Sequence, residues 1–513
     1  MIDTNKTVVT NPLLWADLPD VDPIRAGDSY YMVSTSMHTM PGCPIMKSAD
    51  LLHWETIGYV FETLEDNDGH NLANGQHIYG QGSWAACLRY HEGTFYVCFS
   101  SNDTRSFYVY STADIERGPW RRSVIDGLRH DPALLFDEGR VFVIYGNGDI
   151  YIAELTADAS EVMLGGMNRL LFATDSEGIG LRCEGCHAYK INGYYYLLFI
   201  EWPKAGVGHG RRRQICYRSR ELLGPYERRI VLDDDLGYHN KGVAQGGILD
   251  TPDGAWYAML FQDHDAVGRI PCLVPVAWQD DWPVFGIDGK VPERFEVNLP
   301  PAPAPVKPLV ASDEFNYADN RLGMHWQWNH NPDNRYWSVT ARPGFMRLTA
   351  GSVASSVLRA RNTLTQRTEG PACTAETLLD SAAMKPGDYA GLVALQSHFG
   401  AVGVRVAGNG AKVVSVCVND GSGNERELET VQLEGDVVYL KIAFQFADSI
   451  DLADFYYSTD GRRWTPIGEP LRMKYTLDHF MGYRIGLFQY AGVQAGGYAD
   501  FEYFRYMRDE KGE

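Results

Sequence analysis

The chain has 513 residues, with 46 basic and 66 acidic side chains and a net charge of −20. This length exceeds one ordinary hydrophobic core and predicts roughly two to four domains. The negative field argues against nucleic acid and anionic membrane surfaces as partners, and no apolar run is long enough to span a bilayer.

The N-terminal segment MIDTNKTVVTNPLLWADLPD has no basic stretch followed by an apolar core, so it does not resemble a secretory signal. We therefore expect a cytoplasmic protein. Nine cysteines, an odd number, are scattered along the chain, and several lie in strand-like runs. In a reducing compartment such residues are expected to be buried thiols rather than disulfides.

Five similar segments recur in the first half of the chain. The first is WADLPDVDPIRAGDSYYMVST (15–35), and the others are GTFYVCFS from Gly93, GRVFVIYG from Gly139, NGYYYLLFI from Asn192 and DGAWYAMLF from Asp253. Each joins a turn glycine to a short aromatic strand, and successive turn glycines are 46 to 66 residues apart. Repeats of this length, each a hairpin of short strands, predict a five-bladed β-propeller.

A polar or aromatic residue stands seven to nine positions before each turn glycine. These residues are Asp20, Trp84, Asp131, Glu184 and Gln245. If all five occupy equivalent positions on the inner strands of their blades, their side chains converge on one pocket. A lone acid before a strand is usually structural, so the shared position in the repeats is what supports a functional site.

A second set of similar segments follows the aromatic strands at similar intervals. The segments are SADLLHWETIG (48–58), STADIERGPW (111–120) and SRELLGPYER (219–228). We interpret them as structural pieces at the outer edges of blades.

The sequence divides into three parts, and the all-β propeller is expected to occupy residues 1–296. Residues 297–310, VNLPPAPAPVKPLV, contain five prolines and predict an extended linker. Residues 311–513 alternate apolar and polar side chains between frequent turns, which is typical of a two-sheet β-sandwich. Its segment WQWNHNPDNRYW (326–337) is dense in aromatic and amide side chains. It is either a binding loop or the piece that packs the sandwich against the propeller, and we favour the second.

Three acids at propeller positions suit the hydrolysis of glycosidic bonds. One protonated carboxyl donates to the leaving oxygen, while an ionised one activates water or attacks carbon. A third acid nearby holds up the pKa of the donor through like-charge repulsion. Trp84 would provide a flat face for a sugar ring, and Gln245 a polar floor.

Several motifs resemble glycoside hydrolase family 43, and the resemblance covers nearly the whole chain. PDVDPIRAGDSYYM resembles the family's base motif, HDPALLFDEGRVFVIYG its motif for the pKa-modulating Asp, and CEGCHAYKINGYYYL its general-acid motif. The sandwich resembles the accessory domain of the β-xylosidase and α-L-arabinofuranosidase branch. The family implies a five-bladed propeller that acts with inversion.

The resemblance also implies roles for individual residues. Asp20 would be the general base, Asp131 the pKa modulator and Glu184 the general acid. Asp22 competes for the role of base, but the family pattern places the base four residues before the Ile-Arg pair, which selects Asp20. Asp22 is then a turn or strand-end residue.

By the same resemblance, further residues would contact the substrate. Trp84 would line the sugar subsite and Arg269 reach the bound sugar, while His38 and Met40 would lie at the pocket rim. No cofactor is required.

A calcium ion at the propeller axis is in question. Many relatives carry a histidine beneath the sugar, where it ligates calcium or water, and this chain has Gln245 there. His264 is the alternative ligand. Cys183 and Cys186 flank Glu184 without a second such pair to complete a zinc site, so we interpret them as pocket walls.

The sequence therefore predicts an inverting, exo-acting glycoside hydrolase that releases a terminal pentose from small oligosaccharides. It would be a β-1,4-xylosidase acting on xylo-oligosaccharides or their arabinose-decorated forms, with α-L-arabinofuranosidase activity left open as a second function. Two alternatives are a retaining, fructan-type five-bladed hydrolase and a non-catalytic carbohydrate-binding propeller. Homo-oligomerisation is also left open.

Overall fold

The computed structural model describes residues 6–299, 305–419, 421 and 425–509. Within these ranges the chain forms strands and only three short 3-10 helices, namely η1 (Asp265–Val267), η2 (Val357–Arg359) and η3 (Ala447–Ser449). None of the helices in the described part is long and apolar enough to cross a membrane. The protein is all-β, as predicted.

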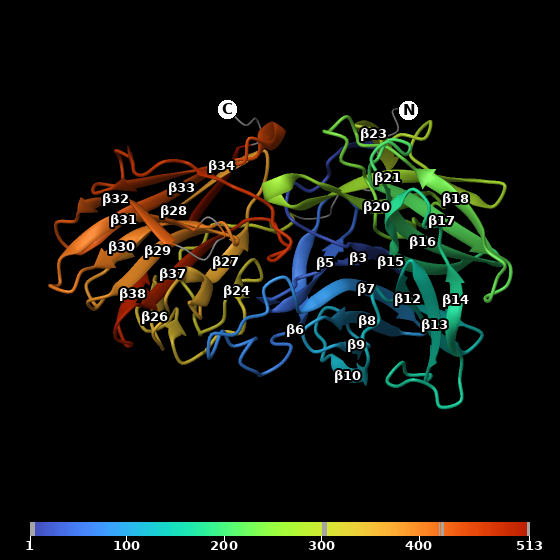
Figure 1. Ribbon diagram of the computed structural model, residues 1–513, viewed down its shortest axis with the longest axis horizontal. Helices are drawn as coiled ribbons and strands as arrows, with labels where there is room; N and C mark the ends of the chain where they lie inside the picture. Colours follow the sequence, from blue (N-terminus) through green and yellow to red (C-terminus); the bar gives the residue numbers. More distant parts are fainter. Residues whose placement is uncertain (1–5, 300–304, 420, 422–424, 510–513) are drawn as a thin grey trace.

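The N-terminal half is a five-bladed propeller, on the right in Figure 1, whose blades within the described residues are antiparallel four-stranded sheets. Blade I consists of β2 (Asp22–Ala26), β3 (Ser29–Val33), β5 (Gly42–Ser48) and β6 (Glu55–Phe61). Blade II consists of β7 (Ser83–His91), β8 (Thr94–Ser101), β9 (Ser106–Thr112) and β10 (Arg121–Asp126). Blade III consists of β11 (Ala133–Asp137), β12 (Arg140–Asn147), β13 (Asp149–Leu155) and β14 (Asn168–Ala173). Blade IV consists of β15 (Ile179–Ile191), β16 (Tyr194–Pro203), β17 (Arg213–Ser219) and β18 (Glu227–Leu232). Blade V consists of β19 (Ile248–Asp250), β20 (Trp256–Asp263), β21 (Arg269–Gln279) and β22 (Trp282–Phe285).

The five predicted hairpins are the first two strands of the five blades. Their turn glycines adopt the left-handed conformation, for example with φ of 83° at Gly93 and 75° at Gly139, which side chains disfavour. The second set of similar segments, 48–58, 111–120 and 219–228, joins the third strand to the fourth in blades I, II and IV. Both sequence interpretations are confirmed.

The ring closes through its first strands and through the ends of the domain. The first strands contact one another from blade to blade, with β19 of the last blade against β2 of the first. The N-terminal strand β1 (Lys6–Thr10) pairs antiparallel with β23 (Arg294–Asn298). Apolar clusters fill the spaces between blades, so each blade is held by its neighbours.

The segment after β23 is only partly described. Residues 300–304 of the predicted linker lie outside the described residues. On either side of them, Leu299, Leu309 and Val310 are buried in the apolar cluster between blades V and I. The described ends of the proline-rich segment are therefore packed on the propeller.

The C-terminal half is a β-sandwich with two large antiparallel sheets, on the left in Figure 1. The first sheet contains β24 (Gln327–Asn329), β27 (Leu364–Arg367), β29 (Asp388–Leu395), β30 (Gly400–Val406), β31 (Lys412–Asn419), β32 (Glu425–Gln432) and β37 (Arg484–Ala491). The second contains β25 (Trp337–Ser338), β26 (Met346–Thr349), β28 (Ala372–Asp380), β33 (Val437–Gln445), β34 (Leu452–Ser458), β35 (Thr465–Pro466), β36 (Leu471–Arg472), β38 (Tyr498–Phe501) and β39 (Arg505–Asp509). Alternate side chains of both sheets form the core between them.

A strand of the propeller completes the first sandwich sheet. The two-residue strand β4 (Thr39–Met40) leaves blade I and pairs with β24, with Met40 opposite Trp328. Beyond β24, the Nε2 atom of His330 accepts a hydrogen bond from the backbone N–H of Ile78, and Asn331 donates to the carbonyl of Glu65. The first half of the segment 326–337 therefore packs the sandwich against the propeller, as favoured.

A cluster of imidazoles lies in this domain interface. The rings of His38, His330 and His479 surround Tyr79, with centroids 4.6 to 5.0 Å from the Tyr79 ring, and all three are buried. Neither ring nitrogen of His38 has a hydrogen-bond partner among the described residues. Burial lowers the pKa of each histidine, that of His479 to about 3. These imidazoles are neutral in the folded protein.

We expect His38→Gln to weaken the dependence of the unfolding free energy on pH. Because the folded pKa lies below the ordinary value of 6.5, the stability due to neutral His38 is complete above pH 6.5 and falls below it. The loss is about 1.4 kcal/mol per pH unit for one histidine. Urea unfolding between pH 7.5 and 5 measures it. Exposed His209→Gln is the control, and equal slopes for wild type and His38→Gln would contradict the expectation.

Candidate active site

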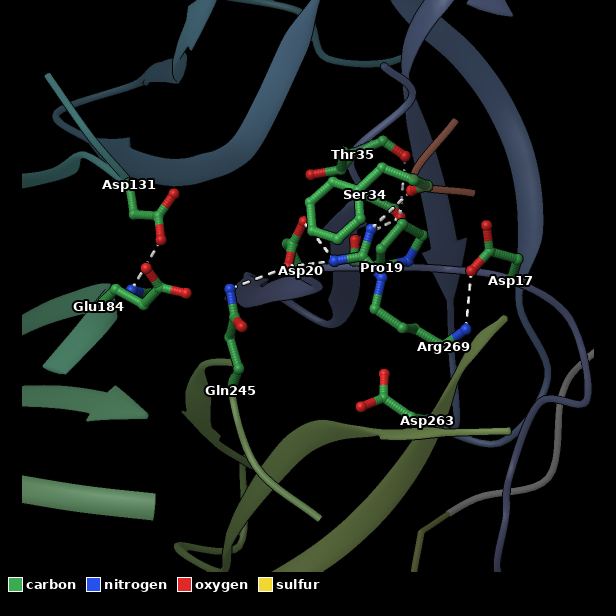
Figure 2. Close-up of polar contacts among 12 residues, drawn as sticks. Asp17, Pro19, Asp20, Ser34, Thr35, Asp131, Glu184, Gln245, Asp263 and Arg269 are labelled. Atoms are coloured by element: carbon green, nitrogen blue, oxygen red, sulfur yellow. Dashed lines mark hydrogen bonds and ion pairs between the residues drawn. The ribbon is translucent and has the colours of Figure 1, made fainter. Parts of the chain in front are cut away.

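A cavity of about 450 Å³ opens at the propeller axis, on the side that faces the sandwich. Its wall includes all five residues predicted from the repeats. Tyr475, Leu477 and Phe480 of the sandwich complete the lining, so the second domain closes part of the cavity. Figure 2 shows Asp131 and Glu184 to one side, Asp20 with Arg269 on the other, and Gln245 reaching between them.

The five predicted residues are not strictly equivalent. Asp20, Asp131 and Gln245 have left-handed φ values of 53°, 45° and 68°. In blades II and IV this conformation belongs to Ala85 and Gly185, with φ of 41° and 68°. The expected equivalence is therefore wrong by one residue in blades II and IV. There Trp84 and Glu184 lie one residue before the left-handed positions, which are Ala85 and Gly185. Register shifts in β7 and β15 next to these residues produce the offset.

Asp20 is held by the backbone before it and by two donors. The carbonyl of Pro19 accepts hydrogen bonds from Ser34 Oγ at 2.7 Å and from the N–H of Thr35 at 3.1 Å. The Oδ1 atom of Asp20 accepts from Gln245 Nε2 at 2.8 Å and from Arg269 Nη1 at 3.1 Å. Among the described residues, the hydrogen-bond partners of this carboxylate are all donors, which suits a group that accepts a proton.

Glu184 and Asp131 share a histidine on the opposite side. Oε2 of Glu184 lies 3.1 Å from His130 Nε2 and accepts from Asn147 Nδ2 at 2.6 Å. Oδ2 of Asp131 accepts from the N–H of Gly185 at 2.9 Å and lies 3.4 Å from His130 Nε2. Asp131 therefore orients the turn that carries Glu184.

The charges in this cluster shift two pKa values. Burial raises the pKa of Asp131 to about 6, and the Glu184 and Asp20 carboxylates add to this while His130 opposes it. The Asp131 and Glu184 carboxylates raise the pKa of His130 to about 9, against its burial. His130 is thus protonated at neutral pH, and the cluster holds a proton beside Glu184.

His130 and Asn147 were missed by the sequence interpretation. His130 stands in the motif RHDPALLF immediately before Asp131, and Asn147 ends β12 after the run GRVFVIYG. Both lay next to residues already singled out, but a single sequence does not show which neighbour of an acid turns toward it.

Trp84 and Arg269 line the cavity as expected. The ring of Trp84 lies 5.2 Å from that of Phe480, and the Arg269 guanidinium lies 4.8 Å from the same ring. Arg269 Nη2 also donates to the carbonyl of Phe480 at 3.3 Å. The sandwich therefore contacts two of the predicted substrate-binding side chains.

The predicted rim positions of His38 and Met40 are corrected. Neither residue belongs to the cavity lining, and both are fully buried. Met40 is buried in the apolar cluster of blades I and II while its backbone pairs with the sandwich through β4, and His38, two residues earlier, lies in the imidazole cluster of the interface.

The cysteines are free and buried, which confirms the expectation of thiols. Cys183 does not form a wall of the cavity, because it packs in the apolar cluster of blades II to IV with its Sγ 3.6 Å from Glu201. Cys186 borders a small void beneath the acids.

Asp22 has a structural place below the cavity. Its carboxylate is fully buried, with Arg89 Nη1 at 2.6 Å, His187 Nδ1 at 2.9 Å and the N–H of Leu88 at 2.8 Å. Although burial alone would raise its pKa, Arg89 and His187 hold the value at about 2. Asp22 is thus an ionised anchor between blades I, II and IV.

His130, Asp131 and Glu184 form the one group in the described part of the chain whose ligating atoms are close enough to hold a metal ion, within 4.8 Å of one another. Gln245 is engaged with Asp20. His264, the other residue considered for calcium, lies outside the cavity lining, where its Nε2 is 2.8 Å from Gln262 Oε1 and its ring stacks on Tyr238.

Comparisons with known proteins agree with both domains. Residues 9–283 match Glycosyl hydrolases family 43, and residues 312–507 match the Beta xylosidase C-terminal Concanavalin A-like domain. A beta-xylosidase of Formosa agariphila is 32% identical over 97% of this chain and 90% of its own length. A non-reducing end alpha-L-arabinofuranosidase of Bacteroides ovatus is 30% identical over 66% of this chain and 64% of its own.

Among solved structures, a bifunctional GH43-CE protein of Bacteroides eggerthii superposes with a TM-score of 0.92 and 45% identity. The superposition covers 98% of this chain, which spans 64% of that longer protein. The propeller, the sandwich and the sequence matches lead to one conclusion: the chain belongs to glycosyl hydrolases family 43 and is a glycoside hydrolase.

Proposed function

We propose that the protein releases a terminal pentose from the non-reducing end of xylo-oligosaccharides, as an inverting β-1,4-xylosidase. The observation that carries this proposal is the placement of Gln245 between two unlike carboxyl groups. Its amide contacts Asp20, while a Cβ on Gly185, next to Glu184, would lie 2.9 Å from its side chain. Gln245 thus lies between Asp20 and the turn that carries Glu184.

The reaction follows from these surroundings. Glu184 donates a proton to the glycosidic oxygen, and the protonated His130, with Nε2 at 3.1 Å from its carboxylate, supplies that proton to Glu184. Asp20, surrounded by donors, accepts a proton from a water that attacks the anomeric carbon on the opposite face of the ring. Inversion requires the two carboxyls about 6.5–9.5 Å apart so that this water fits, whereas retention requires about 5–5.5 Å. Asp131 positions Glu184 and maintains negative charge near it. Side chains make both proton transfers, so the proposed reaction requires no cofactor.

The cavity suits a terminal sugar. Trp84 and Phe480 provide apolar ring faces, and Arg269 and Gln245 provide donors for hydroxyl groups. The sandwich residues close one side, which favours an exo-acting enzyme over one that cleaves within a long chain. A hydrolytic site with its acid, base and orienting residues also argues against a non-catalytic sugar-binding propeller.

A second activity, on α-L-arabinofuranosides, is the other candidate. One of the relatives is named a non-reducing end alpha-L-arabinofuranosidase. The two sugars present similar hydroxyl groups to one pocket, so the same acids would serve both.

Proton NMR of the anomeric region during hydrolysis tests the proposal. We expect 4-nitrophenyl β-D-xylopyranoside to release α-xylose first, and parallel turnover of the α-L-arabinofuranoside ranks the two activities. Early β-xylose would mean retention and would refute the roles of Asp20 and Glu184. Absence of turnover on either glycoside would refute the proposed substrate class.

A further inference from the structure

The second half of the segment 326–337 borders a groove of about 470 Å³ between residues 59–63 of blade I and residues 320–337 of the sandwich. The groove shares no lining residue with the active-site cavity and is similar to it in volume. It is therefore a separate concave site on the same molecule.

Aromatic rings form much of the groove. Trp326, Trp328 and Trp337 all line it, and Tyr59 stands on the propeller side. Trp337 is only half-buried, and its ring lies 5.1 Å from that of Trp328. Its Nε1 donates to Asn334 Oδ1 at 2.8 Å, which fixes the plane of the indole. A rigid, partly exposed indole face suits the apolar C–H face of a sugar ring.

The propeller wall of the groove is fixed in the same way. The Tyr59 hydroxyl donates to the carbonyl of Met324 at 2.6 Å, which ties blade I to the sandwich across the groove. Both walls are thus set before a ligand arrives, so binding would order few side chains.

Polar groups at the rim are available for hydroxyl groups. Among the described residues, the side chains of Glu62 and Thr63 and the Nδ2 of Asn334 have no hydrogen-bond partner, and all three residues are exposed. The rim cation Arg321 already pairs with Asp319 outside the groove. Uncommitted donors and acceptors beside an indole face favour a hydroxyl-rich ligand, and the Glu62 carboxylate disfavours an anionic one.

We propose that this groove is a second saccharide site, which binds an uncharged oligosaccharide segment through Trp337 while the active-site cavity works on a chain end. The choice of ligand class rests on the proposed function. A site of this kind raises the local concentration of chain ends near the cavity without changing the chemistry. Long substrates would benefit and single aryl glycosides would not.

Affinity electrophoresis in gels that contain soluble xylan tests the proposal. We expect the xylan to retard the wild-type protein and Trp337→Ala to weaken binding roughly tenfold, the scale of one aromatic stacking contact. Thr63→Arg should do the same, because this exposed position allows a long side chain to fill the groove without disturbing the core. Both variants should keep kcat/KM on 4-nitrophenyl β-D-xylopyranoside within about twofold of wild type.

Tyr336→Ala is the matched control, because Tyr336 is adjacent in sequence but lines a different cavity. It should be retarded like wild type. Equal retardation of wild type, Trp337→Ala and Thr63→Arg would overturn the proposal. So would a change in oligomeric state on size-exclusion chromatography of the groove variants, since the groove would then be a contact between copies. Retardation that depends on Trp337 in a protein without xylosidase activity would refute the proposed function and leave this site standing.

Discussion

Glu184→Gln is expected to lower kcat/KM on xylobiose by roughly 10²–10⁴-fold, the usual worth of a general acid. The same variant should lose far less on 4-nitrophenyl β-D-xylopyranoside, because nitrophenolate leaves without protonation. Asp20→Asn should be impaired on both substrates, since water must be activated whichever group departs. Initial rates on the two substrates measure the difference.

Exposed Glu177→Gln provides the matched control and should retain both activities. Equal losses of Glu184→Gln on the two substrates would show that Glu184 is not the proton donor. The reverse pattern, with Asp20→Asn sensitive to the leaving group, would exchange the two roles.

Asp22→Asn is expected to lower the free energy of unfolding by about 3–5 kcal/mol. The substitution leaves Arg89 buried without its carboxylate partner, and it removes the negative charge of Asp22 that lies next to His187. Urea unfolding followed by tryptophan fluorescence at pH 7 measures the loss.

Asp28→Asn, in the exposed turn of the same hairpin, is the control and should change stability by less than about 0.5 kcal/mol. A loss of under 1 kcal/mol for Asp22→Asn would mean that the buried ion pair contributes little to holding the blades together. Two aspartates separated by one residue would thus differ sharply in kind, with Asp20 serving the reaction and Asp22 the fold.

The blades were predictable because their signals are local. A turn glycine such as Gly93 and the aromatic strand after it lie within ten residues of each other. The turn connects this strand to the strand before it, and the two are the first strands of the blade. Asp20, Asp131 and Glu184 were found because they recur at nearly constant distances from these turns. The one-residue offset at Glu184 was not visible, because spacing along the chain does not report a bulge in β15.

The remaining features depend on contacts between distant residues. His38 and Met40 were misplaced because β4 pairs with residues almost 300 positions later, and no pattern in a two-residue strand announces such a partner. Phe480 lines the cavity although it lies more than 200 residues after the last propeller residue of that lining, Arg269. His130 approaches Glu184 only when blades III and IV lie side by side.

The pairing of β4 with β24 has a consequence for genes that encode only one of the two domains. A gene fragment that encoded residues 1–296 alone would yield a propeller with an unpaired strand edge and without the sandwich side of its cavity. The sandwich alone would lack the strand at the border of its first sheet. We therefore expect recombination within the proline-rich segment to yield two pieces that each lack part of a shared sheet, with the active-site cavity left incomplete.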